Sequence, residues 1–149
     1  MTMIYLGADH RGYELKEKIK KWLFEWGYKY EDMGAFEYDK DDDNPVFAHA
    51  VAHKVLENKS NKGILICGSG IEIAIAANKI NGIRAGTVTD PEQAVAAVND
   101  ENLNILTLPA DYLSDNKVKK IIKSFLETKF SSKERFNRRL DQIKELENE

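Results

Sequence analysis

Apolar residues gather in short runs that are separated by longer, amphipathic stretches. Runs with almost no polar interruption are typical of strands buried on both faces of a parallel sheet. The sequence has such runs at residues 3–8, 64–66, 83–88 and 104–108, with a weaker one at residues 28–33. This pattern predicts five strands.

The stretches between the runs carry apolar residues at helical spacing. Leu15, Ile19, Trp22 and Trp26 share one face of a first helix, which Gly27 is expected to end. A proline suits a first helical turn, and aspartate or serine suits the position before it. Further helices are expected to begin near Pro45, Ile71, Asp90, Ser114 (or Asp115) and Ser131.

Strands that alternate with helices indicate one α/β domain over residues 1–149. The right-handed crossover rule makes its sheet parallel and doubly wound, with helices on both faces and a C-terminal amphipathic helix. Such sheets bind ligands at the carboxyl ends of their strands. We expect three segments to meet there: Asp9-His10 after the first strand, Cys67 to Gly70 after the third, and Asp100 to Asn104 before the fifth.

The segment Cys67-Gly68-Ser69-Gly70 lies between a buried strand and a helix. Backbone N–H groups at a helix N-terminus favour negative charge, and they lower the pKa of a thiol placed there. Cys67, the chain's only cysteine, is therefore a candidate thiolate. The alternative is an inert buried cysteine, which is the commoner role of a free cysteine.

The last helix carries a basic pair and an apolar stripe. Arg135 and Arg139 are four residues apart and share a face, which suits a phosphate group. A solvated helix face is the alternative. The stripe of Phe136, Leu140 and Ile143 could also dock on a second subunit.

Composition narrows the class of protein. The 149 residues suffice for one core, and 42% apolar with 32% charged residues are typical of a soluble globular protein. A net charge of −3 argues against nucleic-acid binding, and no apolar run is long enough to span a membrane. A single cysteine excludes an intrachain disulfide framework and favours a reducing cytoplasm.

Two groups of residues have metal-binding chemistry without the full pattern of a metal site. Asp39 to Asp43 holds four aspartates but lacks the spacing of a calcium loop, so a solvated loop is favoured. His49 and His53 are one helical turn apart and could hold zinc, but no third ligand is evident. We expect no metal.

A phosphorylated sugar at the carboxyl edge would bring the candidate residues into one reaction. With its phosphate on His10 and the arginines, its C1–C2 end could reach Cys67. Aldose–ketose isomerisation moves a proton between C2 and C1 through an enediolate, which needs a carbon base and oxyanion donors. Cys67 could be that base, the amides of Gly68 to Gly70 the donors, and Ser69 the carrier of the hydroxyl proton. No cofactor is required.

Five segments of the chain resemble, in order and spacing, the type B ribose-5-phosphate isomerases and the related galactose-6-phosphate isomerase subunits. These segments are Gly7–Lys16, Asp41–Pro45, Gly63–Gly70, Ala76–Lys79 and Arg135–Arg139. The resemblance implies a Rossmann-like domain and a homodimer with active sites at the subunit interface. It also implies interconversion of ribose 5-phosphate and ribulose 5-phosphate in the pentose phosphate pathway.

The resemblance also implies roles for single residues. It makes Cys67 the base, Ser69 the proton carrier and Gly68 to Gly70 the oxyanion site, while Asp9 binds sugar hydroxyls or the ring oxygen. The substrate-binding positions that it adds, most of them for the phosphate, are His10, Asn99, Arg135 and Arg139.

Several positions depart from the family's pattern. Val98 or Asp100 stands where a ring-opening histidine is usual, and Asp111 stands where an arginine often helps at the phosphate. Asn44 replaces a tyrosine, and Glu72 replaces a small residue. These departures leave three alternatives open: an isomerase of a tetrose or hexose phosphate, a sugar-phosphate binding or regulatory protein, or a subunit that needs a paralogous partner.

Overall fold

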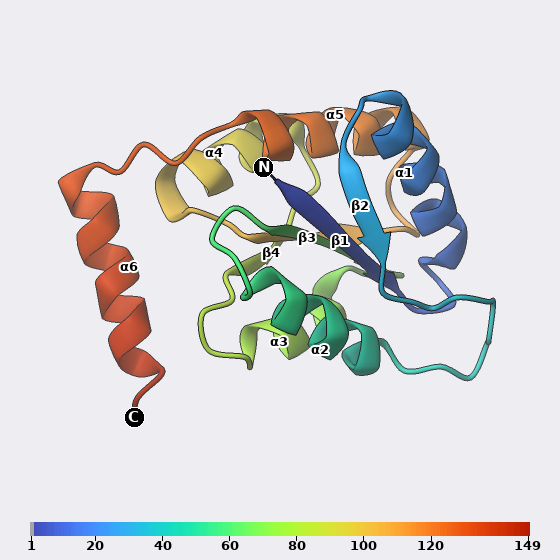
Figure 1. Cartoon of the computed structure of the whole chain (residues 1–149), viewed down its shortest axis with the longest axis horizontal. Helices are drawn as coiled ribbons and strands as arrows, with labels where there is room; N and C mark the ends of the chain where they lie inside the picture. Colours follow the sequence, from blue (N-terminus) through green and yellow to red (C-terminus); the bar gives the residue numbers. More distant parts are fainter. Residues whose placement is uncertain (1) are drawn as a thin grey trace.

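A five-stranded parallel sheet in the order β2-β1-β3-β5-β4 forms the centre of the molecule (Figure 1). The computed structural model describes residues 2–149. Its strands are β1 (Met3–Ala8), β2 (Lys29–Asp32), β3 (Lys62–Cys67), β4 (Ala85–Thr87) and β5 (Ile105–Pro109). Its helices are α1 (Tyr13–Glu25), α2 (Asn44–Val55), α3 (Ile71–Asn78), α4 (Pro91–Glu101), α5 (Asp115–Glu127) and α6 (Glu134–Leu146).

Helices cover both faces of the sheet, so the predicted doubly wound architecture is confirmed. Ile4, Leu6 and Ile64 point to the face that α1, α4 and α5 cover, and they pack in one apolar core. Tyr5 and Leu65, one residue along each strand, point to the opposite face and pack against α2 and α3. No helix among residues 2–149 is long and apolar enough to cross a membrane.

The predicted helix termini are confirmed where a capping residue or a glycine marks them. Asp90 accepts a hydrogen bond from the Glu92 N–H at 3.0 Å, and Ser114 accepts one from the Lys117 N–H at 3.2 Å. Gly27 has a φ of 82° and follows α1, as a helix-ending glycine does. The last helix begins at Glu134 rather than at Ser131, and β4 covers only three of its six predicted residues.

The expectation that Asp100 to Asn104 joins the other two segments is wrong. In a parallel sheet the residues that precede a strand lie at its amino end, and α4 runs back from the carboxyl edge to reach β5. The segment therefore lies at the amino edge, across the sheet from Cys67.

Helices α3 and α6 leave apolar residues exposed to solvent, although helical spacing places these residues on one face of each helix. On α3 the buried residues are Ile73, Ala74 and Ala77, whereas Ile71 and Ile75 are about half exposed. On α6 only Phe136 is buried, and the helix stands apart from the three layers (Figure 1). A helix that covers so little of its own apolar stripe is suited to a further partner.

Candidate functional site

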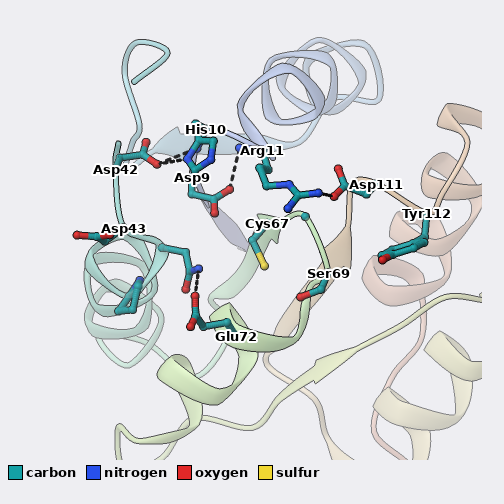
Figure 2. Close-up of a pocket in the computed structure, with 13 residues that line it drawn as sticks. Asp9, His10, Arg11, Asp42, Asp43, Cys67, Ser69, Glu72, Asp111 and Tyr112 are labelled. Atoms are coloured by element: carbon teal, nitrogen blue, oxygen red, sulfur yellow. Dashed lines mark hydrogen bonds and ion pairs between the residues drawn. The ribbon is translucent and has the colours of Figure 1, made fainter. Parts of the chain in front are cut away.

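A pocket of about 360 Å³ opens at the carboxyl edge of the sheet (Figure 2). Its walls come from four segments that are far apart in sequence: the loop after β1, the loop before α2 with the start of that helix, the turn after β3 with the first turn of α3, and the segment after β5. The lining residues are Asp9, His10, Arg11, Asp42, Asp43, Asn44, Pro45, Cys67, Gly68, Ser69, Glu72, Asp111 and Tyr112. Ligand pockets of α/β sheets are expected at this edge.

The turn after β3 brings a thiol, a hydroxyl and backbone amides to one wall. Cys67 is only 3% exposed, and the Gly70 N–H donates to its Sγ atom at 3.2 Å. Ser69 is exposed and its Oγ atom accepts from the Ile71 N–H at 3.2 Å. The N–H groups of Gly68 and Ser69 have no acceptor among residues 2–149. Two of the three predicted oxyanion donors are thus free for a ligand, whereas the third is directed at the sulfur.

Two threonines from the sheet hold this turn in place. Gly70 has a φ of 73°, and a Cβ atom there would lie 2.9 Å from the backbone carbon of Leu108. Only glycine suits that position. The Thr87 and Thr107 hydroxyls lie 2.8 Å from the Gly70 carbonyl oxygen and 2.8 Å from each other. Sequence reasoning missed both threonines, whose only signal is a hydroxyl within an apolar strand.

Asp9 closes the inner wall of the pocket from the end of β1. It is 5% exposed, and its Oδ1 atom accepts from the N–H groups of Arg11 at 3.0 Å and Gly12 at 3.1 Å. Burial raises the pKa of Asp9, although these hydrogen bonds and the nearby His10 oppose the shift. Gly12 allows the loop to approach β3, because a Cβ atom there would lie 2.5 Å from the Ile66 carbonyl oxygen.

His10 is oriented by an aspartate from the loop before α2. The Asp42 Oδ1 atom accepts from the His10 N–H at 2.9 Å and lies 2.9 Å from the ring Nδ1 atom. The Asp42 side chain is only 10% exposed, so the fully solvated loop expected for residues 39–43 is wrong at this position. A hydrogen bond at Nδ1 leaves Nε2 as the atom for a ligand.

Asp9, His10 and Asp42 also form the one group among residues 2–149 whose three ligand atoms, one from each, lie within 4.8 Å of one another. The His10–Asp42 hydrogen bond accounts for the position of two of them. His49 and His53 stack with ring centroids 4.3 Å apart on the exposed side of α2, and the described residues bring no third ligand to them.

Two further contacts involve residues that depart from the family pattern. Arg11 forms an ion pair with Asp111 across the mouth of the pocket. The Asn44 Nδ2 group donates to Glu72 Oε1 at 2.6 Å. Figure 2 shows both pairs, each bridging segments from different strands or helices.

The pocket contains only part of the predicted site. Asp9, His10, Cys67, Gly68 and Ser69 line it, and Gly70 lies directly behind. Asn99 lies in the last turn of α4 at the opposite edge, and Arg135 and Arg139 are exposed on α6. Within one chain, these last three residues are outside the pocket.

Comparisons with known proteins match almost the whole chain. Residues 4–143 match the family model described as ribose/galactose isomerase. The chain is 37% identical to the probable ribose-5-phosphate isomerase B of Mycoplasma genitalium, over 98% of this chain and 96% of that protein. It is 35% identical to the D-erythrulose-4-phosphate isomerase of Pectobacterium atrosepticum, over 87% of this chain and 86% of that protein.

A solved structure has the same fold over the same extent. The crystal structure of ribose-5-phosphate isomerase B from Mycoplasma genitalium with bound ribulose-5-phosphate aligns with a TM-score of 0.94. The alignment covers 99% of this chain and 97% of that one, at 36% identity.

Proposed function

This chain belongs to the ribose/galactose isomerase family and is an isomerase, and we propose that it interconverts ribose 5-phosphate and ribulose 5-phosphate without a cofactor. The family resemblance carried by the five sequence segments is thereby confirmed. The observation that carries the proposal is the meeting of Cys67, Ser69, Asp9 and His10 in one pocket at the sheet's carboxyl edge. The bound ribulose 5-phosphate of the Mycoplasma relative supports the choice of sugar.

The turn after β3 would carry the proton transfers. In the direction from aldose to ketose, the Cys67 thiolate removes the proton from C2, and the electron pair moves onto the aldehyde oxygen to form an enediolate. The free amides of Gly68 and Ser69 stabilise the developing oxyanion. The Ser69 hydroxyl carries the proton from O2 to O1, and Cys67 then returns its proton to C1. The Gly70 N–H donates to the Sγ atom of Cys67 at 3.2 Å and so holds the sulfur in position beside these amides.

The phosphate group lacks cations within the pocket of one chain. Five carboxylates line it, those of Asp9, Asp42, Asp43, Glu72 and Asp111, against only His10 and Arg11. Arg11 is already paired with Asp111. A phosphate dianion there would be repelled unless further positive charge arrives.

We propose that a second copy of the chain supplies this charge from Arg135 and Arg139. Both side chains are exposed on α6, which stands apart from the sheet and the helices that cover it (Figure 1). Exposed Ile71 and Ile75 lie on α3, the helix that carries Glu72 into the pocket. An apolar surface beside an incomplete site favours a homodimer with the site at the interface.

We infer from the chemistry of its base that the reaction takes place in the cytoplasm. A thiolate at Cys67 must stay reduced, and a reducing compartment keeps it so.

A tetrose phosphate is the second candidate substrate. His10 is the only histidine that lines the pocket, and Asp42 engages its Nδ1 atom, so no second imidazole from this chain is present to open a sugar ring. A four-carbon sugar phosphorylated at O4 cannot close a furanose ring and needs no such group. The Pectobacterium relative, which is named for such a sugar, supports this candidate.

Turnover by purified protein distinguishes the candidates. We expect conversion of ribose 5-phosphate in a panel that includes tetrose 4-phosphates and hexose 6-phosphates. Turnover of a tetrose phosphate alone would identify that sugar as the substrate and would leave the proposed mechanism unchanged. Tight binding of sugar phosphates without turnover would contradict the isomerase and favour a binding protein or a paired subunit.

A further inference from the structure

A second polar pocket lies at the amino edge of the sheet, opposite the functional site. Its volume is about 310 Å³, close to that of the first pocket. It is formed where β3, β4 and β5 begin and by the loop that leaves α2. Three of its lining side chains are cations, Lys59, Lys62 and Arg84, four are asparagines, and none is a carboxylate.

Two of these cations are held partly out of water beside each other. Burial lowers the pKa of Lys62, and the positive charge of Arg84 lowers it further. Burial also lowers the pKa of Arg84, against an opposing effect of Glu147, which directly follows α6. Among residues 2–149, no carboxylate forms an ion pair with Lys62 or Arg84. The carboxylate of Glu147, which influences Arg84, accepts a hydrogen bond from the Gly82 N–H at 3.0 Å.

The protein's own acceptors use only part of the donor capacity of this pair. Arg84 donates from Nε to the Asn102 carbonyl at 2.7 Å and from Nη1 to the Gly82 carbonyl at 3.3 Å. Lys62 reaches the Leu103 carbonyl at a long 3.4 Å. Asn102 and Leu103 follow α4, so one cation here complements the end of that helix. The Nη2 group of Arg84 has no acceptor in the described chain. The Lys62 Nζ atom also lies 5.2 Å from the centroid of the Phe125 ring, a cation–π contact that supplies no counter-charge.

The position of the arginine is fixed. The backbone N–H of Arg84 donates to Asn104 Oδ1 at 2.7 Å, and the Asn104 Nδ2 group donates to the Gly82 carbonyl at 3.0 Å. The backbone of Arg84 is thus fixed, and its guanidinium is fixed through the Nε and Nη1 atoms. Such a guanidinium loses little entropy when it binds a planar or tetrahedral oxyanion.

We propose that this pocket binds a doubly charged phosphate group, either inorganic phosphate or the phosphate of a small monoester. Such an anion would compensate Lys62 and Arg84 together and would take the free Nη2 donors. Lys59 and the side chain of Asn102 lie in the wall as further contacts. The site is separate from the substrate pocket, because the two lie at opposite ends of the parallel strands.

Titration of the full-length protein with inorganic phosphate tests the proposal. Isothermal titration at low ionic strength is expected to give two sites per chain in the wild type. Arg84→Gln and Lys62→Gln should each weaken one of them by about tenfold or more, since each loses a charge-assisted contact. Both variants should keep wild-type isomerase turnover, because neither residue touches the substrate pocket.

Three controls keep the outcome clear. His10→Ala should weaken the other phosphate site and leave the one at Arg84 unchanged. Lys129→Gln removes an exposed charge outside both pockets and should change neither. A parallel titration with glycerol 3-phosphate separates the two sources, because tighter binding than inorganic phosphate assigns the pocket to a monoester.

A single phosphate site per chain that Arg84→Gln and Lys62→Gln both leave unchanged would overturn the proposal. Two sites that both survive in Arg84→Gln and in Lys62→Gln would overturn it equally. Because isomerase turnover is measured on the same samples, a loss of folding in one variant is recognised, and the other variant then decides.

Discussion

Four of the five acidic side chains that line the substrate pocket have a partner within the chain, and these pairings decide which groups remain free for a phosphate. Asp42 orients His10, Glu72 holds Asn44, and Asp111 neutralises Arg11. Asp9 stays buried against the backbone of the loop after β1. The net negative charge of the pocket is unfavourable for a phosphorylated substrate. The proposed reaction therefore depends on side chains that these pairings hold in position.

At the residue scale, Asp111→Asn is expected to improve substrate binding. The change removes a negative charge from the mouth of the pocket and frees Arg11 for the phosphate. We expect KM for ribose 5-phosphate to fall by about two- to fivefold at low salt with kcat nearly unchanged, and the gain to shrink at high salt. Steady-state kinetics measures it, and Asp115→Asn, at an exposed pair with Lys18, is the control. A higher KM in Asp111→Asn would contradict this role.

At the scale of elements, the functional turn depends on the two strands beside it. Thr87 on β4 and Thr107 on β5 both lie against the Gly70 carbonyl, so the sheet fixes the geometry of the amides in front of Cys67. A hydroxyl has one hydrogen to donate, so two of the three contacts in this group are donated at a time.

Thr107→Val is expected to loosen the turn without emptying the core. The variant should lose about 1 kcal/mol of stability, because one hydrogen bond is removed. We expect kcat to fall by about three- to tenfold with KM nearly constant, since misplaced amides weaken only the oxyanion stage. Thr107→Ser, which keeps the hydroxyl, should recover kcat. Equal losses of kcat in both variants would show that packing, and not the hydrogen bond, matters at this position.

A second element-level feature joins α1 to the end of β2. Lys16 is completely buried, and its Nζ atom lies 2.6 Å from Asp32 Oδ2 and 2.7 Å from the Ala35 carbonyl oxygen. Burial alone would raise the pKa of Asp32, but hydrogen bonds from Lys16, Lys20 and the Gly34 N–H lower it overall. The ionised carboxylate thus stabilises the fold above its ordinary pKa, and this stability is lost as pH falls through the lowered value.

Asp32→Asn is therefore expected to destabilise the protein in a pH-dependent way. At pH 7 the variant leaves Lys16 buried without its counter-charge, which costs about 3–5 kcal/mol. The difference from wild type should begin to shrink as pH falls below about 4, where Asp32 takes up a proton in the unfolded chain, and should shrink further as pH falls through the lowered pKa of the folded protein. Urea unfolding at several pH values measures the gap, with exposed Asp141→Asn as the control. A gap that is the same at pH 3 and pH 7 would contradict the charge argument.

Much of the fold and part of the site could be predicted from the sequence because strands and helices alternate along the chain. The alternation of strands and helices fixes which residues lie at the carboxyl end of a strand: Asp9 and His10 follow β1, and Cys67 is the last residue of β3. Contacts that depend on a long loop or a neighbouring strand, such as Asp42 to His10 or Thr107 to Gly70, have no periodic signal. Asn99 lies outside the pocket of its own chain, because it comes before β5 and not after a strand.

At the scale of the whole molecule, the lack of positive charge in the pocket and the exposed basic face of α6 support the same arrangement, in which two chains share one site. Arg135 and Arg139 are outside the pocket of their own chain, and a partner that receives α6 would gain both. One chain would then hold the reacting carbon while the other holds the phosphate.

Mixing two inactive variants tests this arrangement. Cys67→Ala lacks the base, and the double variant Arg135→Ala with Arg139→Ala lacks the phosphate contacts. If the arginines act on the partner's site, subunit exchange should restore about a quarter of wild-type activity, because half of the dimers are mixed and one of their two sites is complete. Placing all three substitutions on one chain and mixing it with Cys67→Ala should restore none. An inactive mixture in the first case would contradict the shared site, as would a monomeric mass by light scattering.

The most direct test of the central claim is the conversion of ribose 5-phosphate in deuterated water by wild type and by Cys67→Ser, followed by NMR. We expect the wild type to form ribulose 5-phosphate that carries solvent deuterium at the carbon where the proton is returned. Cys67→Ser should lose about a thousandfold or more of this rate while it keeps its fold. A wild type that leaves ribose 5-phosphate unchanged, or a Cys67→Ser variant that exchanges and isomerises at the wild-type rate, would contradict the account.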